Sequence, residues 1–208
     1  MRKARHIPIL TKEQIQRFLE AAKSHQMEEL LMVALLTGIR QGELRALQWR
    51  HVDLESRTIQ VCRTLHSLPP TQRDEEAACP WRRLIVLPQV AVSALHSQWE
   101  HQSLLRKQSG EEWSDHDLVF ADPWGRPFSA KSLLHTFYQI LDEAKLPPLH
   151  FHDLRRNTLA ILLSLGVSQP VVGAILGHKV IAMTTTLYAH ITPFMLDDGM
   201  RKWDDFLG

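Results

Sequence analysis

Four short stretches of the sequence hold side chains of the kinds that bind anions or move protons. Guanidinium groups can present paired N–H donors to an anion, and imidazoles take up protons near neutral pH. A phenol can act as a nucleophile when a neighbouring base helps to remove its proton. The candidate residues are Arg40 and Glu43 in "TGIRQGELRAL", His152 and Arg155 in "HFHDLRR", His178 after a glycine, and Tyr188 in "TTTLYAHI".

Each of these residues alone has an ordinary explanation. An aromatic residue such as Tyr188, in a late helix, usually fills a gap in the core, and an arginine just past a helix end, such as Arg40, is usually solvated. Glu43 follows Arg40 by three residues and could hold its guanidinium by a charge-assisted contact. The ordered series of Arg, His-x-x-Arg, Gly-His and Tyr is a stronger signal than any of its members.

The elements that must position these residues are mostly helices. Thr11, with Gln14 three residues later, has the pattern of a capping box at a helix start, and Gly38 is well placed to end the next helix. His152 and Arg155 are three residues apart, so they should share one face of a helix that begins near them. Helices are expected at residues 10–24, 27–38, 41–49 (ending near Trp49), from Pro88 onward, and at 129–144, 152–166, 168–177 and 192–207.

Two segments rich in β-branched and apolar residues indicate strands of a small sheet. They are "TIQVCR" at residues 58–63 and "RRLIVL" at 82–87. The polar, proline-containing segment between them, residues 64–82, is long for a hairpin connection. The sequence therefore predicts a mainly helical domain with a small sheet.

Composition favours a soluble globular protein. The chain has 208 residues, of which 44% are hydrophobic, enough to bury a proper core. Its N-terminus, "MRKARHIPIL", does not resemble a signal peptide, and no apolar run reaches the roughly 18 residues of a membrane span. Cys62 and Cys79 are too few and too isolated for a disulfide framework. We expect a cytoplasmic protein with free thiols.

The net charge of +1 is low for a nucleic-acid binder, but the charges are segregated along the chain. Residues 2–23 carry six basic side chains against two acidic ones, whereas "EEWSDHDLVFAD", residues 111–122, has five acids and no lysine or arginine. Such a distribution allows a basic face on a nearly neutral protein.

The motifs resemble those of the tyrosine recombinases, the family of phage integrases and their relatives. The similarity extends from "LTKEQIQRFL" to the last helix and is densest at "TGIRQGELRALQW", "HDLRRNTLAILLSLGV" and "ILGH". It implies a mainly α fold with a small antiparallel β-sheet (α+β). It also implies a site-specific recombinase or integrase that cuts and rejoins double-stranded DNA through a 3′-phosphotyrosyl link. Family members commonly assemble as tetramers on paired DNA sites, and such a protein would work in the cytoplasm at the nucleoid.

The resemblance gives each candidate residue a role. Tyr188 resembles the nucleophile, His152 the proton acceptor, and His178 a hydrogen-bond donor to the phosphate. A phenol has an ordinary pKa of about 10, so it needs a base and a cationic surrounding to attack at neutral pH.

The two arginines, Arg40 and Arg155, resemble the phosphate clamp, and Glu43 the acid that supports it. Paired guanidinium donors can stabilise the negative charge that grows on the phosphate oxygens in the transition state, without losing their own protons. Because one ester replaces another, rejoining needs no ATP. The absence of a Walker loop and of a carboxylate cluster in the sequence fits a reaction without cofactor or metal.

Two features depart from the family pattern. The family usually has a catalytic lysine before the second or third strand, where residues 77–79 read Ala-Ala-Cys, and no lysine occurs between Lys23 and Lys107. Arg73, Arg82 or Arg83 could approach the phosphate instead. The spacing from His178 to Tyr188 is also one residue longer than the common arrangement.

Three alternatives remain open on the sequence. The missing lysine allows a catalytically impaired, DNA-binding relative of the family. Type IB topoisomerases share the mechanism. A metal-binding protein could use His150, His152, His178 and His190, although carboxylate partners at ligand spacing are not apparent.

The domain organisation is expected to be simple. Residues 1–208 are interpreted as a single catalytic domain without a separate N-terminal DNA-clamping domain, either a piece of a longer protein or a short family member. By resemblance, the tail helix at residues 193–208 is expected to dock on a neighbouring protomer, because Phe194, Trp203, Phe206 and Leu207 need cover.

Overall fold

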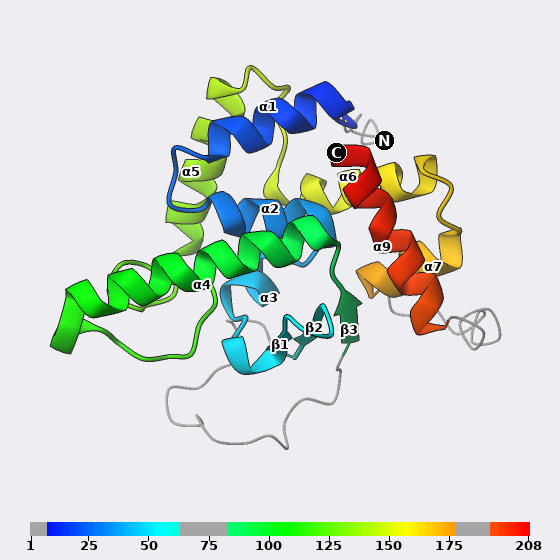
Figure 1. Ribbon diagram of the computed structural model, residues 1–208. Helices are drawn as coiled ribbons and strands as arrows, with labels where there is room; N and C mark the ends of the chain where they lie inside the picture. The colour runs from blue at the N-terminus through cyan, green and yellow to red at the C-terminus, as the bar shows by residue number, and fades with distance from the viewer. Residues whose placement is uncertain (1–7, 63–82, 178–191) are drawn as a thin grey trace, which may run out of the picture.

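A computed structural model describes residues 8–62, 83–177 and 192–208 of the chain (Figure 1). Helices dominate, as the sequence predicts. The elements are α1 (Lys12–Ala22), α2 (Glu28–Thr37), α3 (Gln41–Arg45), the 3₁₀ turn η1 (Trp49–His51), β1 (Val52–Asp53), β2 (Thr58–Val61), β3 (Arg83–Val86), α4 (Gln89–Ser109), the 3₁₀ turn η4 (Gly110–Glu112), α5 (Ala130–Glu143), α6 (Phe151–Ser164), α7 (Gln169–Leu176) and α9 (Pro193–Leu207).

A small antiparallel sheet lies against the helices, in the strand order β1-β2-β3. In the register of β2 with β3, Ile59 faces Ile85, and both side chains are fully buried. The prediction of a mainly helical fold with a small antiparallel sheet is confirmed. The sequence did not indicate β1, because its two residues are too few to show an alternating pattern.

The first helix begins as predicted, and the third ends earlier than predicted. Thr11 caps α1 in a capping box with Gln14. The expectation that the third helix runs to near Trp49 is wrong, because α3 ends at Arg45. Beyond it the backbone of Leu47 and Gln48 pairs with Leu118 and Val119, and that pairing takes the hydrogen bonds a longer helix would need.

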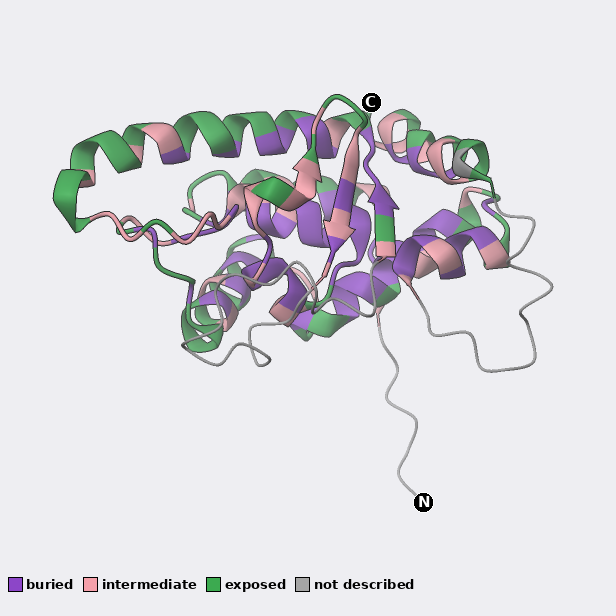
Figure 2. Ribbon diagram, turned by 90° about the horizontal axis from the view of Figure 1, so that it is seen from below, coloured by how far each residue is buried: buried purple, intermediate pink, exposed green. Residues whose placement is uncertain are grey.

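Helix α2 forms the centre of the core. Its residues from Leu30 to Thr37 are almost all buried, and it packs against α1, α4 and α6. Figure 2 shows buried residues concentrated in the central helices and strands, while the long helix α4 keeps an exposed outer face. Among the helices of the described residues, none is long and apolar enough to cross a membrane.

Polar side chains fix α6 against its neighbours. The Thr158 hydroxyl donates to the backbone oxygen of Leu35 at 2.6 Å, and the side-chain oxygen of Asn157 accepts from the backbone N–H of Leu10 at 2.7 Å. Both side chains are fully buried, so each contact satisfies a group that would otherwise cost about 1–3 kcal/mol. These bonds set the position of α6 relative to α2 and to the start of α1.

The last helix, α9, packs on its own chain in this structure, beside α6 and α7 (Figure 1). Met200 and Trp203 are fully buried, while Phe194, in the first turn, is 70% exposed. Asp204 also ties α9 to α4, because its carboxylate accepts from the backbone N–H groups of Gln89 and Val90 at 2.9 Å each. Exchange of this helix between protomers stays a prediction.

The carboxylate of Asp204 substitutes for an N-cap on α4, where Pro88 offers no side-chain acceptor. We therefore expect Asp204→Ala to lower the free energy of unfolding by about 1 kcal/mol, as loss of an N-cap does. Urea unfolding followed by circular dichroism measures this. Asp205→Ala is the matched control, because Asp205 is the exposed neighbour on the same helix and should change stability by less than about 0.5 kcal/mol. Equal effects of both variants would contradict the capping role.

Candidate active site

The structure brings four of the six predicted site residues into neighbouring positions. Arg40 is the N-cap residue of α3, and Glu43 lies in its first turn. His152 and Arg155 lie in the first turns of α6. The other two, His178 and Tyr188, lie outside the described residues, as do residues 77–79, where the family's lysine is expected.

Arg155 is the buried centre of this group, with only 5% of its surface exposed. Its Nη1 donates to the backbone oxygen of Gly38 at 2.6 Å, and its Nη2 donates to that of Leu176. Gly38 caps the C-terminus of α2, and Leu176 is the last residue of α7. A single guanidinium thus satisfies carbonyl groups at two helix ends, where a positive charge is favourable.

The backbone at these two helix ends requires glycine. Gly38 and Gly177 each cap a helix with a φ of 63°, in the left-handed region. Space is also restricted at Gly38, where a β-carbon would lie 2.5 Å from the Leu176 side chain and 3.4 Å from that of Arg155. The two turns therefore approach each other closely across Arg155.

Burial and neighbouring cations lower the pKa of Arg155 to about 10. Desolvation is the largest cause, followed by the positive charges of Arg40 and Arg83, and the charge of Glu43 offsets them in part. The guanidinium still carries its proton at neutral pH. This mutual repulsion of the arginines indicates a place where an additional anion would be stabilised.

Glu43 is the carboxylate that holds the other two arginines. Its oxygens accept from the backbone N–H and from Nη1 of Arg40, each at 3.0 Å. They also accept from Nη1 and Nη2 of Arg83, each at 2.8 Å, in a two-pronged contact. Burial alone would raise the pKa of Glu43, but the hydrogen bonds and charges of Arg83 and Arg40 outweigh it and lower the pKa.

Arg83 is a member of the cluster that the sequence indicated only loosely, as one of three arginines able to approach a phosphate. It begins β3, with 16% of its side chain exposed, and lies against the turn at Gly177. Strand alternation could have located it, because Arg83 is two residues before the fully buried Ile85 and therefore shares its inward face.

His152 lies beside this cluster with its residue exposed, at the second position of α6. Partial desolvation lowers the pKa of its imidazole, and the charges of Arg156, Arg155 and Arg40 lower it further, against a smaller opposing effect of Asp153. A helix N-terminus disfavours a cation in the same way. His152 is therefore neutral at pH 7 and able to accept a proton.

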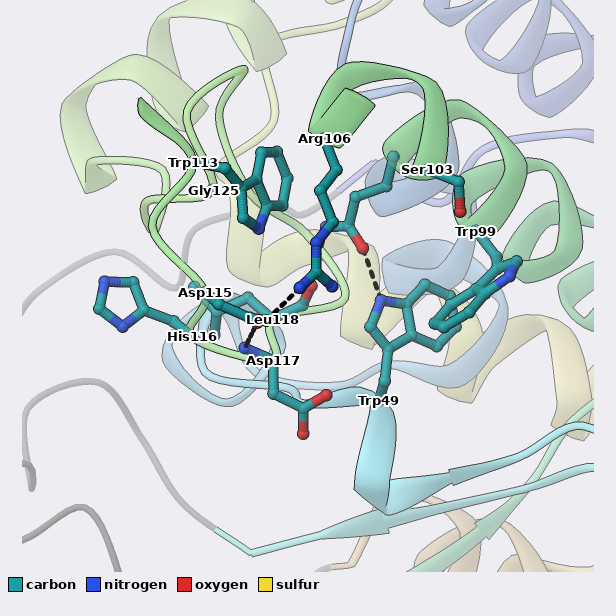
Figure 3. A pocket seen from close by; sticks show the side chains of 11 residues that line it. Trp49, Trp99, Ser103, Arg106, Trp113, Asp115, His116, Asp117, Leu118 and Gly125 are labelled. Atoms are coloured by element: carbon teal, nitrogen blue, oxygen red, sulfur yellow. Dashed lines mark hydrogen bonds and ion pairs between the residues drawn. The ribbon is translucent and has the colours of Figure 1, made fainter. Parts of the chain in front are cut away.

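A separate cavity of about 170 Å³ lies beside the C-terminal half of α4 (Figure 3). Trp49, Trp99 and Trp113 line it, and the indole of Trp49 donates to Gln102 at 2.6 Å. Arg106 crosses it to pair with Asp115 at 2.7 Å. Arg40, Glu43, His152 and Arg155 are not among the described residues that line this cavity, so it is separate from the arginine cluster.

The described residues include no group of three or more histidine, cysteine, aspartate or glutamate side chains placed to hold a metal ion. Of the four histidines of the metal-binding alternative, His178 and His190 lie outside the described residues. His150 caps α6, with its backbone N–H donating to Asp153 at 2.8 Å.

Among curated relatives, a tyrosine recombinase XerC-like protein of Caldanaerobacter subterraneus subsp. tengcongensis is 28% identical, over 96% of this chain and 54% of that protein. An integrase of Streptomyces ambofaciens is 31% identical over 86% of this chain and 48% of that protein. The chain thus spans about half the length of the curated relatives it matches.

Solved structures share the fold. The Tn1549 transposon integrase in complex with transposon right end DNA superposes with a TM-score of 0.70 at 21% identity, covering 97% of this chain and 68% of that one. The XerA recombinase gives a TM-score of 0.66 at 23% identity, covering 94% of this chain and 65% of that one. In addition, residues 8–194 match the sequence pattern of the phage integrase family. The chain therefore belongs to the phage integrase family, as its motifs indicated.

Proposed function

We propose that this chain is the DNA-cutting part of a site-specific tyrosine recombinase or integrase. It cleaves and rejoins double-stranded DNA through a 3′-phosphotyrosyl intermediate formed by Tyr188. The observation that carries the proposal is a cluster of arginines with a neutral imidazole beside it. In this cluster Arg40 and Arg83 pair with one carboxylate, and the charge of Arg155 acts on both arginines. Family membership adds the expectation that the anion is a DNA phosphate.

The two predicted clamp arginines have different surroundings. Arg40 is 45% exposed and fixed by Glu43, so its guanidinium is oriented yet able to meet a ligand. Arg155 is buried and already donates to two carbonyl groups, so it contributes charge and fixes the walls of the site. Both remain positively charged as charge grows on the phosphate in the transition state.

The proton of the attacking phenol passes to His152 in this scheme. The imidazole is neutral at pH 7 because its pKa is lowered, which is the state a general base needs. His178 is assigned as a donor to the phosphate by resemblance to the family, and it directly follows Gly177 in the sequence.

The whole reaction implies partners and a location. Two DNA duplexes must be held together for strand exchange, so we propose a tetramer on paired sites. Chromosomal DNA as substrate would place the protein in the cytoplasm, at the nucleoid. The family match and DNA-bound structures of similar fold, such as that of the Tn1549 integrase, support DNA as the substrate.

An impaired, DNA-binding relative is the competing proposal, because residues 77–79 lack lysine. The relatives reported above bear the names integrase and tyrosine recombinase, which favours the active form. By resemblance to the family, the lysine is expected to protonate the 5′-oxygen as it leaves. Substrates with sulfur at this bridging position separate the two proposals, because a thiolate leaves without a proton and the Tyr188 adduct can then form even without that acid.

Tyr188→Phe should abolish the covalent protein–DNA adduct and leave DNA binding nearly unchanged, because only the attacking oxygen is removed. The adduct is measured on denaturing gels, with sulfur-bridged duplexes from the protein's own genetic neighbourhood as substrate. Tyr138→Phe is the control, because Tyr138 is the chain's other tyrosine and lies half-exposed on α5. Loss of the adduct in the Tyr138 variant, and not in the Tyr188 variant, would refute the assignment.

Arg40→Lys and Arg155→Lys should both reduce adduct formation by about 10²-fold or more, because an ammonium cannot reproduce a planar, two-pronged contact. Their stabilities should differ. Arg155→Lys should also lower the thermal unfolding midpoint, since it leaves two buried carbonyl groups poorly satisfied, whereas Arg40→Lys should not. Near-normal cleavage by both variants would mean that these arginines only position DNA.

The pH dependence of cleavage should reflect the lowered pKa of His152. An imidazole acts as a general base when it is neutral, so the cleavage rate at subsaturating DNA should rise with pH to a plateau. The midpoint of this rise should lie below about 6.5, the ordinary pKa of histidine. Arg156→Gln should move that midpoint to higher pH, because it removes a charge that lowers the pKa. An unshifted midpoint in this variant would show that another group controls the acid limb.

A further inference from the structure

We propose that Arg83 is a positioning residue for the DNA-cutting reaction, and this inference rests on the proposed function. Arg83 joins two parts of the site that are distant in the sequence. Its terminal nitrogens hold Glu43 on α3, and the rest of its guanidinium and its Cδ lie against the turn at Gly177 after α7. Moving Arg83 therefore moves the support of Arg40 and the backbone that leads into His178.

The contact with Glu43 determines the direction of Arg40. Glu43 uses Oε1 for both arginines, at 3.0 Å from Nη1 of Arg40 and 2.8 Å from Nη1 of Arg83. The second oxygen receives Nη2 of Arg83 and the backbone N–H of Arg40. The two-pronged contact with Arg83 fixes the plane of the carboxylate, and that plane fixes where Arg40 can donate.

The contact with Gly177 is equally close. A β-carbon at this glycine would lie 2.0 Å from Cδ and 2.7 Å from Nε of Arg83, so the arginine occupies the space that a side chain would need. Arg155 holds the preceding residue, Leu176, through its carbonyl oxygen. The end of α7 is thus held between two arginines.

Arg83 does not serve as the missing proton donor. Both of its terminal nitrogens already donate to Glu43, and a guanidinium does not readily give up a proton. Its contribution is to geometry.

The site of Arg83 is not optimised for stability. Its Nε is buried and has no hydrogen-bond acceptor in the part of the chain that the structure describes. Buried ion pairs of this kind add little stability compared with apolar side chains, and an unsatisfied buried donor is unfavourable. A feature with this cost is expected where it orients functional groups.

The test compares Arg83→Lys and Arg83→Gln with wild type in single-turnover cleavage of sulfur-bridged duplex at saturating DNA. We expect both variants to form the Tyr188 adduct about 10²-fold more slowly, as a misplacement of catalytic groups by about 1 Å does, with DNA affinity changed by no more than about threefold. Equal losses of affinity and rate would make Arg83 a direct phosphate contact and overturn the proposal. Wild-type rates in both variants would overturn it as well.

Arg106→Gln is the matched control, because Arg106 also pairs with a carboxylate but lies in the separate cavity of Figure 3. Its cleavage rate should equal that of wild type. Thermal unfolding of each variant separates rate loss from unfolding. If Arg83→Gln does not fold, Arg83→Lys carries the test, because it keeps the positive charge and loses the two-pronged contact with Glu43.

A double-mutant cycle checks that Arg83 acts through Glu43. Glu43→Gln alone should slow cleavage, and adding Arg83→Gln should slow it little further, because both changes remove the same support. Independent, multiplicative losses would overturn the proposal. A wild-type protein that forms no Tyr188 adduct would refute the proposed function instead, so the two failures are distinguishable.

Discussion

The buried guanidinium of Arg155 is the interaction on which the rest of the site depends. A full positive charge at 5% exposure is unfavourable unless strong acceptors surround it, and here backbone oxygens of Gly38 and Leu176 supply them. Both acceptors lie at helix C-termini, where unpaired carbonyl groups and the helix dipole favour a cation. The Arg155 side chain, which comes from α6, therefore connects the C-terminal ends of α2 and α7. Gly38 and Gly177 end these two helices in the left-handed conformation that is common at helix C-termini.

The same helix-capping contact occurs at the starts of α3 and α6. In each helix an acid in the first turn reaches back to the backbone N–H of the N-cap residue, Glu43 to Arg40 and Asp153 to His150. This capping contact fixes the start of each helix, and with it the candidate site residues Arg40 and His152. In α3 the same carboxylate also accepts from two guanidinium groups. Helix capping and orientation of the site are therefore performed by the same atoms, so a change at Glu43 alters both.

The sequence predicted most of the fold because helix periodicity and caps are local. Every long helix of the described residues was expected, and Thr11 and Gly38 have the predicted roles. It also predicted the contact between Arg40 and Glu43, because Glu43 lies three positions after Arg40. The link from Arg83 to Glu43 spans forty positions, and no local pattern encodes such a distance. The carbonyl acceptors of Arg155 were missed for a related reason, because backbone oxygens carry no sequence signature.

Local concentration of charge makes the proposed phosphate site compatible with a net charge of +1. In the described part of the site, Glu43 pairs with Arg40 and Arg83, and Arg155 lies close enough for its charge to act on theirs. The positive charges of the three arginines exceed the negative charge of Glu43. Burial is the main cause of the lowered pKa of Arg155, and the positive charges of Arg40 and Arg83 lower that pKa further. A bound phosphate would relieve the repulsion among these positive charges. Net charge averages over the whole surface, whereas recognition depends on the electric field at one place, so a near-neutral total is compatible with a site for a polyanion.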